Sequence, residues 1–351
     1  MEQKTTERCK SAEKEIQPAQ GQLADRVIRQ ISPDTGNGAK IMPHAHTQGR
    51  RHRLLSLLAA GAAALSIASL AGAAGPREVA LEAAPSGHRL LPVTIDGEGP
   101  FVFILDTGAT HTAIAAPVAA LFGFQSDWAL FDDVQALTTR FEAERFALQD
   151  LHLSGQDPID LVSVIIPVTE DQPVTVAGLL GADAIRSPRY AIDFAAARLT
   201  LDAPAPRRED GEISPLGLLT AEADIRQSRR PIRVMLDSGS ARTLINPRLA
   251  QRLASRHVIV NPVAVGGVDG RLQEDAEPAI VRNFRVGGLC IPAFSVLEAD
   301  LDIFRHLGWQ DEPAMILGMD LMQFARIGID REAGTFEIDA SGERFACGDR
   351  D

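Results

Sequence analysis

Two aspartates stand at the end of apolar segments, where a carboxylate is costly. Asp106 ends the apolar run in "FILDTGATHTAI" (103–114), and Asp237 does the same in "VMLDSGSARTLI" (234–245). A carboxylate at the end of a buried strand costs folding free energy unless it is hydrogen-bonded or used in chemistry. The repeated placement therefore indicates that both acids have a function.

The two residues after each acid suit a turn that presents the carboxylate. Gly108 and Gly239 permit a tight turn that a Cβ atom would obstruct. Thr107 and Ser238 provide hydroxyl groups that can bond to the backbone or across to the other copy. Each turn is expected to hold one carboxylate at the tip of a rigid strand.

Two such carboxylates can carry out acid and base catalysis together. Carboxylates in contact do not both ionise easily, so they share a proton, and one titrates low while the other titrates high. If Asp106 and Asp237 meet, the pair can withdraw a proton from a trapped water while it donates one to a carbonyl oxygen. This chemistry needs no metal, cofactor or covalent nucleophile, and the sequence shows no His/Cys cluster at metal-ligand spacing.

The acids belong to a longer internal repeat. Measured from the acid, residues 99–114 and 230–245 both carry Pro at −6, Leu at −1, Thr at +6 and Ile at +8. A second shared segment, "GLLGAD" (178–183) and "MILGMD" (315–320), places its Leu-Gly pair at similar distances after the two acids. This self-similarity predicts two lobes of ordinary domain size related by a pseudo-twofold axis.

The elements that must position the acids are mostly strands. Residues 88–105 alternate in polarity on both sides of a turn, and residues 190–201 and 327–338 are typical of hairpins that close each lobe. Helix-like segments at 116–124 and 246–256 follow the two acidic turns. The sequence predicts a mainly β fold with short helices.

These motifs resemble a known family. "LDTGA" and "LDSGS", each followed by an apolar-apolar-Gly segment, are similar to those of retropepsin-like and pepsin-like aspartic proteases, and most of all to bacterial exported aspartyl proteases with two lobes in one chain. The resemblance covers residues 88–340. It implies two acid-protease β-barrel lobes and an aspartic endopeptidase that hydrolyses peptide or protein substrates, with Asp106 and Asp237 as the catalytic pair.

The resemblance also implies supporting roles around the pair. Thr107 and Ser238 are expected to brace the dyad, while Gly108 and Gly239 complete its turns. The residues expected beneath the two active-site loops as structural support are Leu180, Gly181, Leu317 and Gly318.

The sequence departs from this class at the flaps. Members cover the pair with a glycine-rich hairpin that excludes water and contacts the peptide. Residues 263–275 predict either such a flap or a simple turn. The candidate flap residues are Gly266, Gly267, Asp269 and Gly270. The corresponding first-lobe stretch, 131–146, contains no glycine, and the single tyrosine, Tyr190, lies far downstream.

Other polar residues of the repeat have structural interpretations. His111 is expected on an exposed loop, because the other copy has an arginine there. Asp183 and Asp320 follow a glycine and precede helix-like segments, which favours helix N-capping over catalysis. Asp193 and Asp330 are expected to serve hairpin turns.

The N-terminal part differs from the rest of the chain. Residues 1–49 are polar and resemble a disordered tail, whereas residues 50–76 begin with basic residues and continue as an uncharged run over 54–75. This pattern predicts a signal peptide or membrane anchor, and hence an exported protein that is periplasmic or anchored facing the periplasm. The two predicted lobes then span 77–203 and 204–351.

Composition restricts the partners. The formal net charge of −12 argues against a nucleic-acid partner, and both acids in one chain make an obligate dimer unnecessary. Glycoside hydrolysis also uses two carboxylates but calls for aromatic sugar platforms, for which Trp128 and Trp309 are the only tryptophans. An exported peptide-binding module without turnover is the alternative to a protease.

The three cysteines of the sequence permit a disulfide but do not establish one. Cys9 lies in the polar tail, which leaves Cys290 and Cys347 in the predicted lobes. These two could pair in an oxidising compartment, but their proximity does not follow from the sequence.

Overall fold

The computed structural model describes residues 75–123, 130–167, 176–253, 263–266 and 272–348. Residues 75–351 form one compact unit. The predicted tail and most of the leader, residues 1–74, lie outside the described residues. Within the described residues, the structure contains no helix that is both long and apolar enough to span a membrane.

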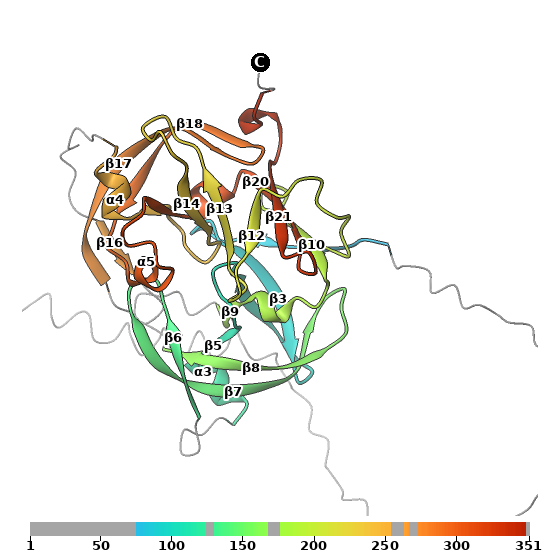
Figure 1. Ribbon diagram of the computed structural model, residues 1–351. Helices are drawn as coiled ribbons and strands as arrows, with labels where there is room; N and C mark the ends of the chain where they lie inside the picture. Colours follow the sequence, from blue (N-terminus) through green and yellow to red (C-terminus); the bar gives the residue numbers. More distant parts are fainter. Residues whose placement is uncertain (1–74, 124–129, 168–175, 254–262, 267–271, 349–351) are drawn as a thin grey trace, which may run out of the picture. The chain divides into compact units, whose positions relative to one another are not determined.

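Strands dominate this unit and form two sheets (Figure 1). The eight-stranded sheet contains, in order, β2 (Glu82–Ala83), β3 (Arg89–Ile95), β4 (Glu98–Leu105), β9 (Gly178–Leu180), β5 (Ala113–Ala115), β8 (Ile159–Ile166), β7 (Arg140–Leu153) and β6 (Phe131–Gln135).

The larger sheet contains thirteen strands, among them the first and the last strand of the described residues. Its order is β1 (Arg77–Ala80), β11 (Arg198–Leu201), β10 (Arg189–Asp193), β20 (Ala325–Asp330), β21 (Thr335–Ala340), β12 (Gly211–Ile213), β13 (Leu219–Ala223), β14 (Ile232–Leu236), β19 (Ala314–Leu317), β15 (Leu244–Ile245), β18 (Leu289–Glu298), β17 (Leu272–Val286) and β16 (Val263–Gly266).

The helices of the described residues are short. The α-helices are α3 (Ala116–Leu121), α4 (Pro247–Ala250), α5 (Asp302–His306) and α6 (Met319–Met322), and the 3₁₀ turns are η2 (Ala182–Ala184) and η3 (Glu343–Phe345). Helices α3 and α4 confirm the helix-like segments expected after the two acidic turns, and each has a proline in its first turn, where the missing N–H is harmless.

Strand pairing repeats between the two halves of the chain. Strand β4 pairs in parallel with β9, as β14 does with β19, and β5 and β15 pair antiparallel with the same partners. Strand β5 also pairs in parallel with β8, and β15 does so with β18. Strand β8 pairs in turn with β7 of the hairpin β6–β7, and β18 pairs with β17 of the hairpin β16–β17. The prediction of a mainly β fold with two related lobes is confirmed.

The two closing hairpins form as predicted, but they also join the lobes. Strands β10 and β11 pair antiparallel, and so do β20 and β21. Strand β10 in addition pairs with β20, with Tyr190 opposite Ile329. The largest hydrophobic cluster accordingly includes residues of both halves, such as Leu105, Ile192, Leu236 and Ile327.

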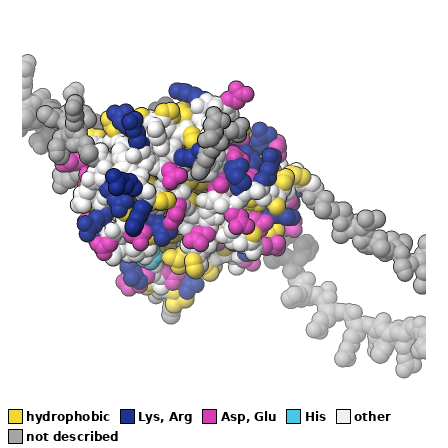
Figure 2. Space-filling view, turned by 45° about the horizontal axis from the view of Figure 1, so that its top comes forward, with side chains coloured by type: hydrophobic (Ala, Val, Ile, Leu, Met, Phe, Trp, Pro, Cys, Tyr) yellow, Lys and Arg dark blue, Asp and Glu magenta, His cyan; other side chains and the backbone are white. Residues whose placement is uncertain are grey.

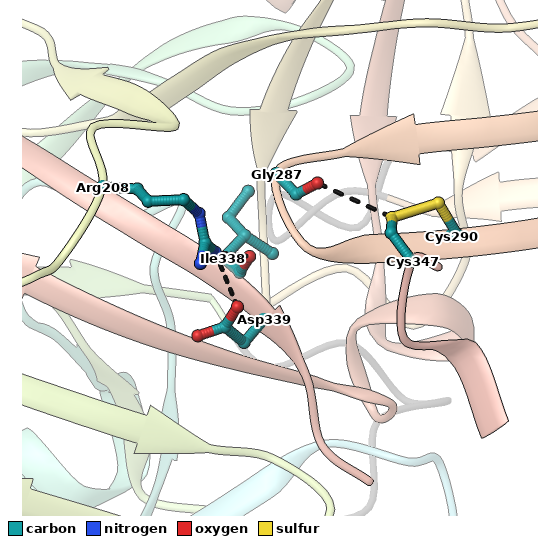
Figure 3. Close-up of a disulfide and its surroundings, with 6 residues drawn as sticks. All are labelled: Arg208, Gly287, Cys290, Ile338, Asp339 and Cys347. Atoms are coloured by element: carbon teal, nitrogen blue, oxygen red, sulfur yellow. Dashed lines mark hydrogen bonds and ion pairs between the residues drawn. A yellow bond between two sulfur atoms is a disulfide. The ribbon is translucent and has the colours of Figure 1, made fainter. Parts of the chain in front are cut away.

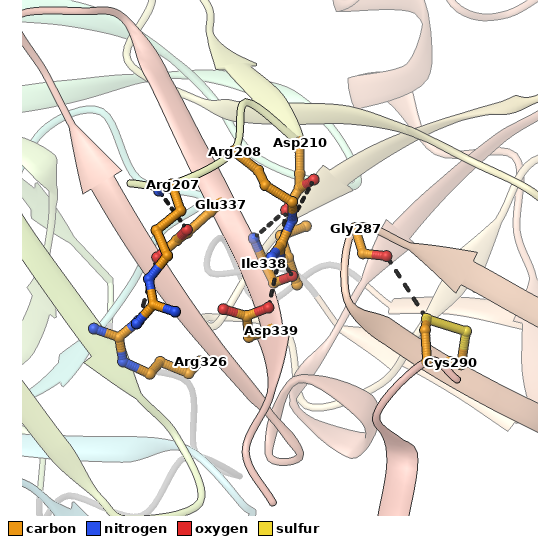
Figure 4. A network of polar contacts seen from close by, with 10 residues as sticks. Arg207, Arg208, Asp210, Gly287, Cys290, Arg326, Glu337, Ile338 and Asp339 are labelled. Carbon is orange, nitrogen blue, oxygen red and sulfur yellow. Dashed lines mark hydrogen bonds and ion pairs between the residues drawn. A yellow bond between two sulfur atoms is a disulfide. The ribbon is translucent and has the colours of Figure 1, made fainter. Parts of the chain in front are cut away.

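A polar network fixes the segment between the halves onto β21 (Figure 4). The N–H of Arg207 donates to Glu337 Oε2 at 2.8 Å, and the guanidinium of Arg208 pairs with Asp210 and Asp339. The N–H of Asp210 donates to the Phe336 carbonyl at 2.9 Å. Residues 202–212, whose proline and charge content is typical of a linker, are therefore held against the sheet.

Elsewhere on the surface, charges of both signs are interspersed (Figure 2). Arg233 pairs with Glu222 and Glu312, and Arg305 pairs with Asp300 and Asp302. Exposed pairs of this kind each contribute little to stability because water and salt screen them.

A disulfide answers the question that the sequence left open. Cys290 on β18 is bonded to Cys347, which follows η3, across a sequence separation of 57 residues (Figure 3). It fastens the C-terminal segment to the second-lobe sheet. Closing a loop of this length restricts the unfolded chain and typically stabilises the fold by about 2–4 kcal/mol.

Candidate active site

The two aspartates follow equivalent strands and are both buried. Asp106 comes directly after β4 and is 7% exposed, while Asp237 comes directly after β14 and is 4% exposed. The N–H of Asp106 donates to the Leu180 carbonyl at 3.0 Å, and the N–H of Asp237 donates to the Leu317 carbonyl at 3.0 Å. Each acid therefore starts its turn from a fixed point on the neighbouring parallel strand.

Each turn is closed by the carboxylate that it carries. Asp106 Oδ1 accepts a hydrogen bond from the Gly108 N–H at 2.8 Å, and Asp237 Oδ1 accepts one from the Gly239 N–H at 2.9 Å. Because the bond closes within three residues, it fixes the orientation of the carboxyl plane. The second carboxyl oxygen of each acid, Oδ2, is left for contacts outside its own turn.

The glycines bring the two turns together. A Cβ atom added to Gly108 would lie 2.6 Å from Asp237 Cγ, and one added to Gly239 would overlap the Asp106 carboxyl group. Each glycine thus faces the acid of the opposite half. Each carboxyl group acts on the pKa of the other, so the two side chains lie within interaction distance.

Thr107 and Ser238 connect the halves through four hydrogen bonds. Thr107 Oγ1 donates to the Leu236 carbonyl at 3.0 Å and accepts from the Ser238 N–H at 3.0 Å. Ser238 Oγ donates to the Leu105 carbonyl at 2.7 Å and accepts from the Thr107 N–H at 2.9 Å. Each hydroxyl donates one bond to the opposite half and accepts one from it, so the connection runs in both directions.

Removing one of these hydroxyls is expected to destabilise the whole unit. Thr107→Val keeps the shape of the side chain but leaves the Ser238 N–H and the Leu236 carbonyl without partners. Two buried, unsatisfied backbone groups cost on the order of 2–4 kcal/mol. Urea unfolding measures the loss, with the partly exposed Thr139→Val as the control. Equal midpoints for the two variants would contradict a bracing role.

The Leu-Gly segments lie against the threonines six residues after each acid. The Gly181 N–H donates to Thr112 Oγ1 at 3.2 Å, and the Gly318 N–H donates to Thr243 Oγ1 at 3.1 Å. A Cβ atom on Gly181 would lie 2.6 Å from the His111 carbonyl carbon, so the backbones are too close for a side chain. The segments of Leu180 and Leu317 are thus packed directly against the acidic loops.

The predicted N-cap role of Asp183 and Asp320 is wrong. The N-cap positions are Gly181 for η2 and Gly318 for α6, and neither helix has a side-chain cap. Asp183 Oδ1 instead accepts from the Thr112 N–H and hydroxyl, at 2.9 and 2.8 Å, and Asp320 Oδ1 accepts from the Thr243 hydroxyl at 2.6 Å. Asp183 and Asp320 orient Thr112 and Thr243 in the acidic loops. They bond to these threonines because the nearest donors lie there and not at the helix ends.

The expectations for His111, Asp193 and Asp330 agree with the structure. His111 is exposed. Asp193 and Asp330 accept backbone N–H bonds within the turns of their hairpins, as predicted. Tyr190 is buried in β10, and burial raises its pKa to about 12. It therefore cannot serve as a flap residue.

Burial and proximity make the two acids unequal. Burial raises the pKa of Asp237 well above the usual value, and the charge of Asp106 raises it further. Burial also raises the pKa of Asp106, but the Gly108 N–H and the hydrogen bond from Asp237 oppose the shift. Both shifts favour a pair that retains one proton above the usual carboxyl range, and the pKa of Asp237 is raised by the charge of Asp106 in addition to burial.

The raised pKa of Asp237 makes the free energy of unfolding depend on pH. A carboxyl whose pKa is raised in the folded state costs nothing below the unfolded value of 3.8, and it destabilises the fold as the pH rises through the folded pKa. We expect Asp237→Asn to unfold at higher urea concentration than the wild type at pH 7, and the difference to shrink near pH 3.

A control of opposite sign is available for that measurement. Arg305 lowers the pKa of the partly exposed Asp302 carboxyl, and Gln135 lowers it further, so its ionised form stabilises the fold. Asp302→Asn is expected to lose stability at pH 7 and to match the wild type near pH 3. If Asp237→Asn followed the same pattern as Asp302→Asn, the pKa of Asp237 would not be raised.

A hairpin without glycine forms in the first-lobe stretch that corresponds to the flap of the resembled class. Strands β6 and β7 pair as a hairpin whose turn is closed by the Ala136 N–H, which donates to the Thr139 carbonyl at 2.9 Å. The turn reaches the second half of the chain. The Ile303 N–H donates to the Leu137 carbonyl at 3.3 Å, and Gln135 donates to Asp302 at 3.2 Å. Figure 1 shows β6 and α5 side by side.

The candidate flap of the second lobe is described only in part. Strands β16 and β17 pair antiparallel, and Gly266 ends β16 opposite Leu272. The other candidate flap residues, Gly267, Asp269 and Gly270, lie outside the described residues.

Sequence reasoning missed one residue beside the acids. His88 is half-buried, and its Nε2 lies 3.0 Å from the Gly239 carbonyl. The signal that could have found it is the turn before each acidic strand, because "APSGH" (84–88) and "SPLGL" (214–218) share Pro and Gly at the same positions.

Two β lobes with a pseudo-twofold repeat, and an aspartate pair held by Asp-Thr-Gly and Asp-Ser-Gly turns, define the acid-protease fold class. The family model described as "Aspartyl protease" matches residues 91–184 and 221–321, more than half of the chain. The protein therefore belongs to the aspartyl protease family. A search of curated proteins gave no match.

Proposed function

We propose that the protein is an aspartic endopeptidase that hydrolyses peptide bonds with water, using Asp106 and Asp237 as its catalytic pair. The observation that carries this proposal is that two buried carboxyl groups lie within interaction distance on turns that face each other. A site that shares one proton can act as base and acid in the same step. Membership of the aspartyl protease family supports the same reaction class.

The pKa of Asp237 is raised well above its usual value, and we therefore assign Asp237 as the acid and Asp106 as the base of the first step. The Asp106 carboxylate withdraws a proton from a water between the acids, and the water oxygen attacks the carbonyl carbon of the scissile bond. Asp237 donates its proton to the carbonyl oxygen, which gives a neutral tetrahedral diol. Charge therefore does not accumulate on the substrate in this buried site.

The second step returns the protons. Asp237 takes back a hydroxyl proton as the carbonyl re-forms, and Asp106 gives its proton to the leaving nitrogen as the C–N bond breaks. The products are a carboxylic acid and an amine, and the pair again holds one proton. The Thr107–Ser238 connection supports this cycle by keeping the carboxyl groups in place through both proton transfers.

One chain supplies the complete site under this proposal. Asp106 and Asp237 lie in the same compact unit, so a second copy is not needed to pair them. The proposed substrate is a peptide or protein in extended conformation, held between the acids and the hairpins β6–β7 and β16–β17. Neither a metal nor a cofactor takes part.

A peptide-library digest tests the proposed activity. We expect cleavage of internal peptide bonds between pH 3 and 8, with the products identified by mass spectrometry, and inhibition by a statine peptide such as pepstatin. Binding of the inhibitor without cleavage of any peptide would instead indicate a peptide-binding module. Cleavage that is unaffected by Asp106→Asn would place the activity elsewhere.

We further propose that the protein is exported, with residues 54–75 as a signal or membrane anchor. The basic residues before this uncharged run and the Cys290–Cys347 disulfide support this location, because disulfides persist in oxidising compartments. Cell fractionation tests it. A product in the cytoplasm with both thiols free would contradict export.

A further inference from the structure

A histidine from the first lobe contacts the acidic turn of the second. His88 precedes β3, and its Nε2 lies 3.0 Å from the Gly239 carbonyl. A carbonyl only accepts, so Nε2 carries the hydrogen. Nδ1 lies 2.8 Å from Ser86 Oγ, which donates to the neutral ring. The imidazole is thereby fixed at both nitrogens beside the dyad.

The second lobe has the same turn without the histidine. The Gly87 N–H donates to Ala84 and the Ala84 N–H to His88, and the same two bonds join residues 214, 217 and 218. In that turn Leu216 and Leu218 occupy the positions of Ser86 and His88. Leu218 is buried in an apolar cluster. The backbone of the site is therefore symmetric, whereas its polar surroundings are not.

Of the two acids, Asp106 is the one whose pKa is influenced by His88. Its carboxylate attracts the His88 proton and raises the histidine pKa, against the stronger lowering caused by burial. The reverse also holds, because charge on His88 lowers the pKa of Asp106. The neighbouring cation, Arg89, turns its guanidinium to the Phe194 and Gly87 carbonyls. Asp237 is linked to His88 only through the Gly239 backbone.

We propose that His88 is a positioning residue that breaks the symmetry of the dyad, leaving Asp106 ionised and the shared proton on Asp237. The inference rests on the proposed function for its kinetic consequence, but the protonation states are a property of the resting protein. Leu218, in the equivalent place, offers neither charge nor hydrogen bond to the other acid.

The kinetic consequence is a shift of the acid limb of the pH profile. Hydrolysis requires the first proton to leave the pair, and a cationic His88 favours that ionisation at low pH. We expect His88→Gln to move the acid limb of kcat/KM upward by about 0.5–1 pH unit. Gln can still donate to the Gly239 carbonyl, so a purely structural role predicts no shift. The exposed His111→Gln serves as the control.

A measurement that needs no turnover tests the protonation states directly. Nuclear magnetic resonance follows the imidazole signal of His88 against pH in the full chain, and His88→Gln assigns that signal. We expect Asp106→Asn to lower the His88 pKa by about 0.5 unit or more, because it removes the neighbouring carboxylate. Asp237→Asn leaves Asp106 ionised and is expected to leave the His88 pKa unchanged or raise it.

The outcomes separate this inference from the proposed function. If Asp237→Asn lowers the His88 pKa and Asp106→Asn does not, the proton assignment is overturned whether or not the protein cleaves peptides. If neither variant changes it, His88 is only structural. If the titration behaves as expected but no peptide is cleaved, the proposed function fails and the inference about the dyad stands.

Discussion

Replacing either acid of the pair by asparagine is expected to lower kcat/KM for peptide cleavage by about 10³-fold or more. Asp106→Asn removes the carboxylate that takes the proton from water, and Asp237→Asn removes the proton that the carbonyl oxygen receives. An amide can do neither, although it is close to a carboxyl group in size. The two variants should therefore be equally inactive, despite the different pKa values of the two acids.

This result requires folded variants and a matched control. Asn can preserve the bonds from the Gly108 and Gly239 N–H groups through its side-chain oxygen. We expect circular dichroism spectra like that of the wild type. Asp311→Asn, at an exposed ion pair with Arg248, should retain full activity. Activity that survives in one of the two acid variants would exclude a paired mechanism.

Gly239→Ala is expected to lower kcat/KM by about 10²-fold or more, with one added methyl group. The new Cβ would overlap the Asp106 carboxyl group, so Asp106 must move away from its partner. The backbone of Gly239 does not occupy the left-handed region, so alanine brings no φ strain there. The loss is thus caused by displacement of the acid, and kinetics on a cleaved library peptide measures it.

Two further variants make this prediction specific. Gly108→Ala should have a similar effect from the other side, because its Cβ would approach Asp237 at 2.6 Å. Gly348→Ala places a methyl group where no atom lies within 4 Å and should behave like the wild type. Full activity in Gly239→Ala would mean that the carboxyl groups are not held as close together as the structure indicates.

The sequence predicted the parts of the site that depend on local patterns. The apolar strands before Asp106 and Asp237, the turn-forming Gly108 and Gly239, and the closing hairpins all follow from residue type and spacing. Because these patterns occur twice, they also predicted two related lobes. The strand pairings of β4 with β9 and of β14 with β19 confirm that repeat.

What the sequence did not predict depends on how the lobes dock. The approach of His88 to the Gly239 carbonyl joins residues 151 positions apart, and the contact of the β6–β7 turn with α5 joins residues 166 apart at Leu137 and Ile303. The Cys290–Cys347 bond likewise follows from the placement of a terminal segment. Asp183 was misassigned because its nearest donors, on Thr112, lie 71 residues away.

The most direct test of the central claim is whether the two acids act as one unit. The rate of cleavage of one library peptide would be compared for the wild type, Asp106→Asn, Asp237→Asn and the double variant. We predict the same residual kcat/KM for all three variants, because either substitution alone abolishes the shared-proton mechanism. Losses that multiply in the double variant would show two independent carboxylates and contradict the proposed dyad.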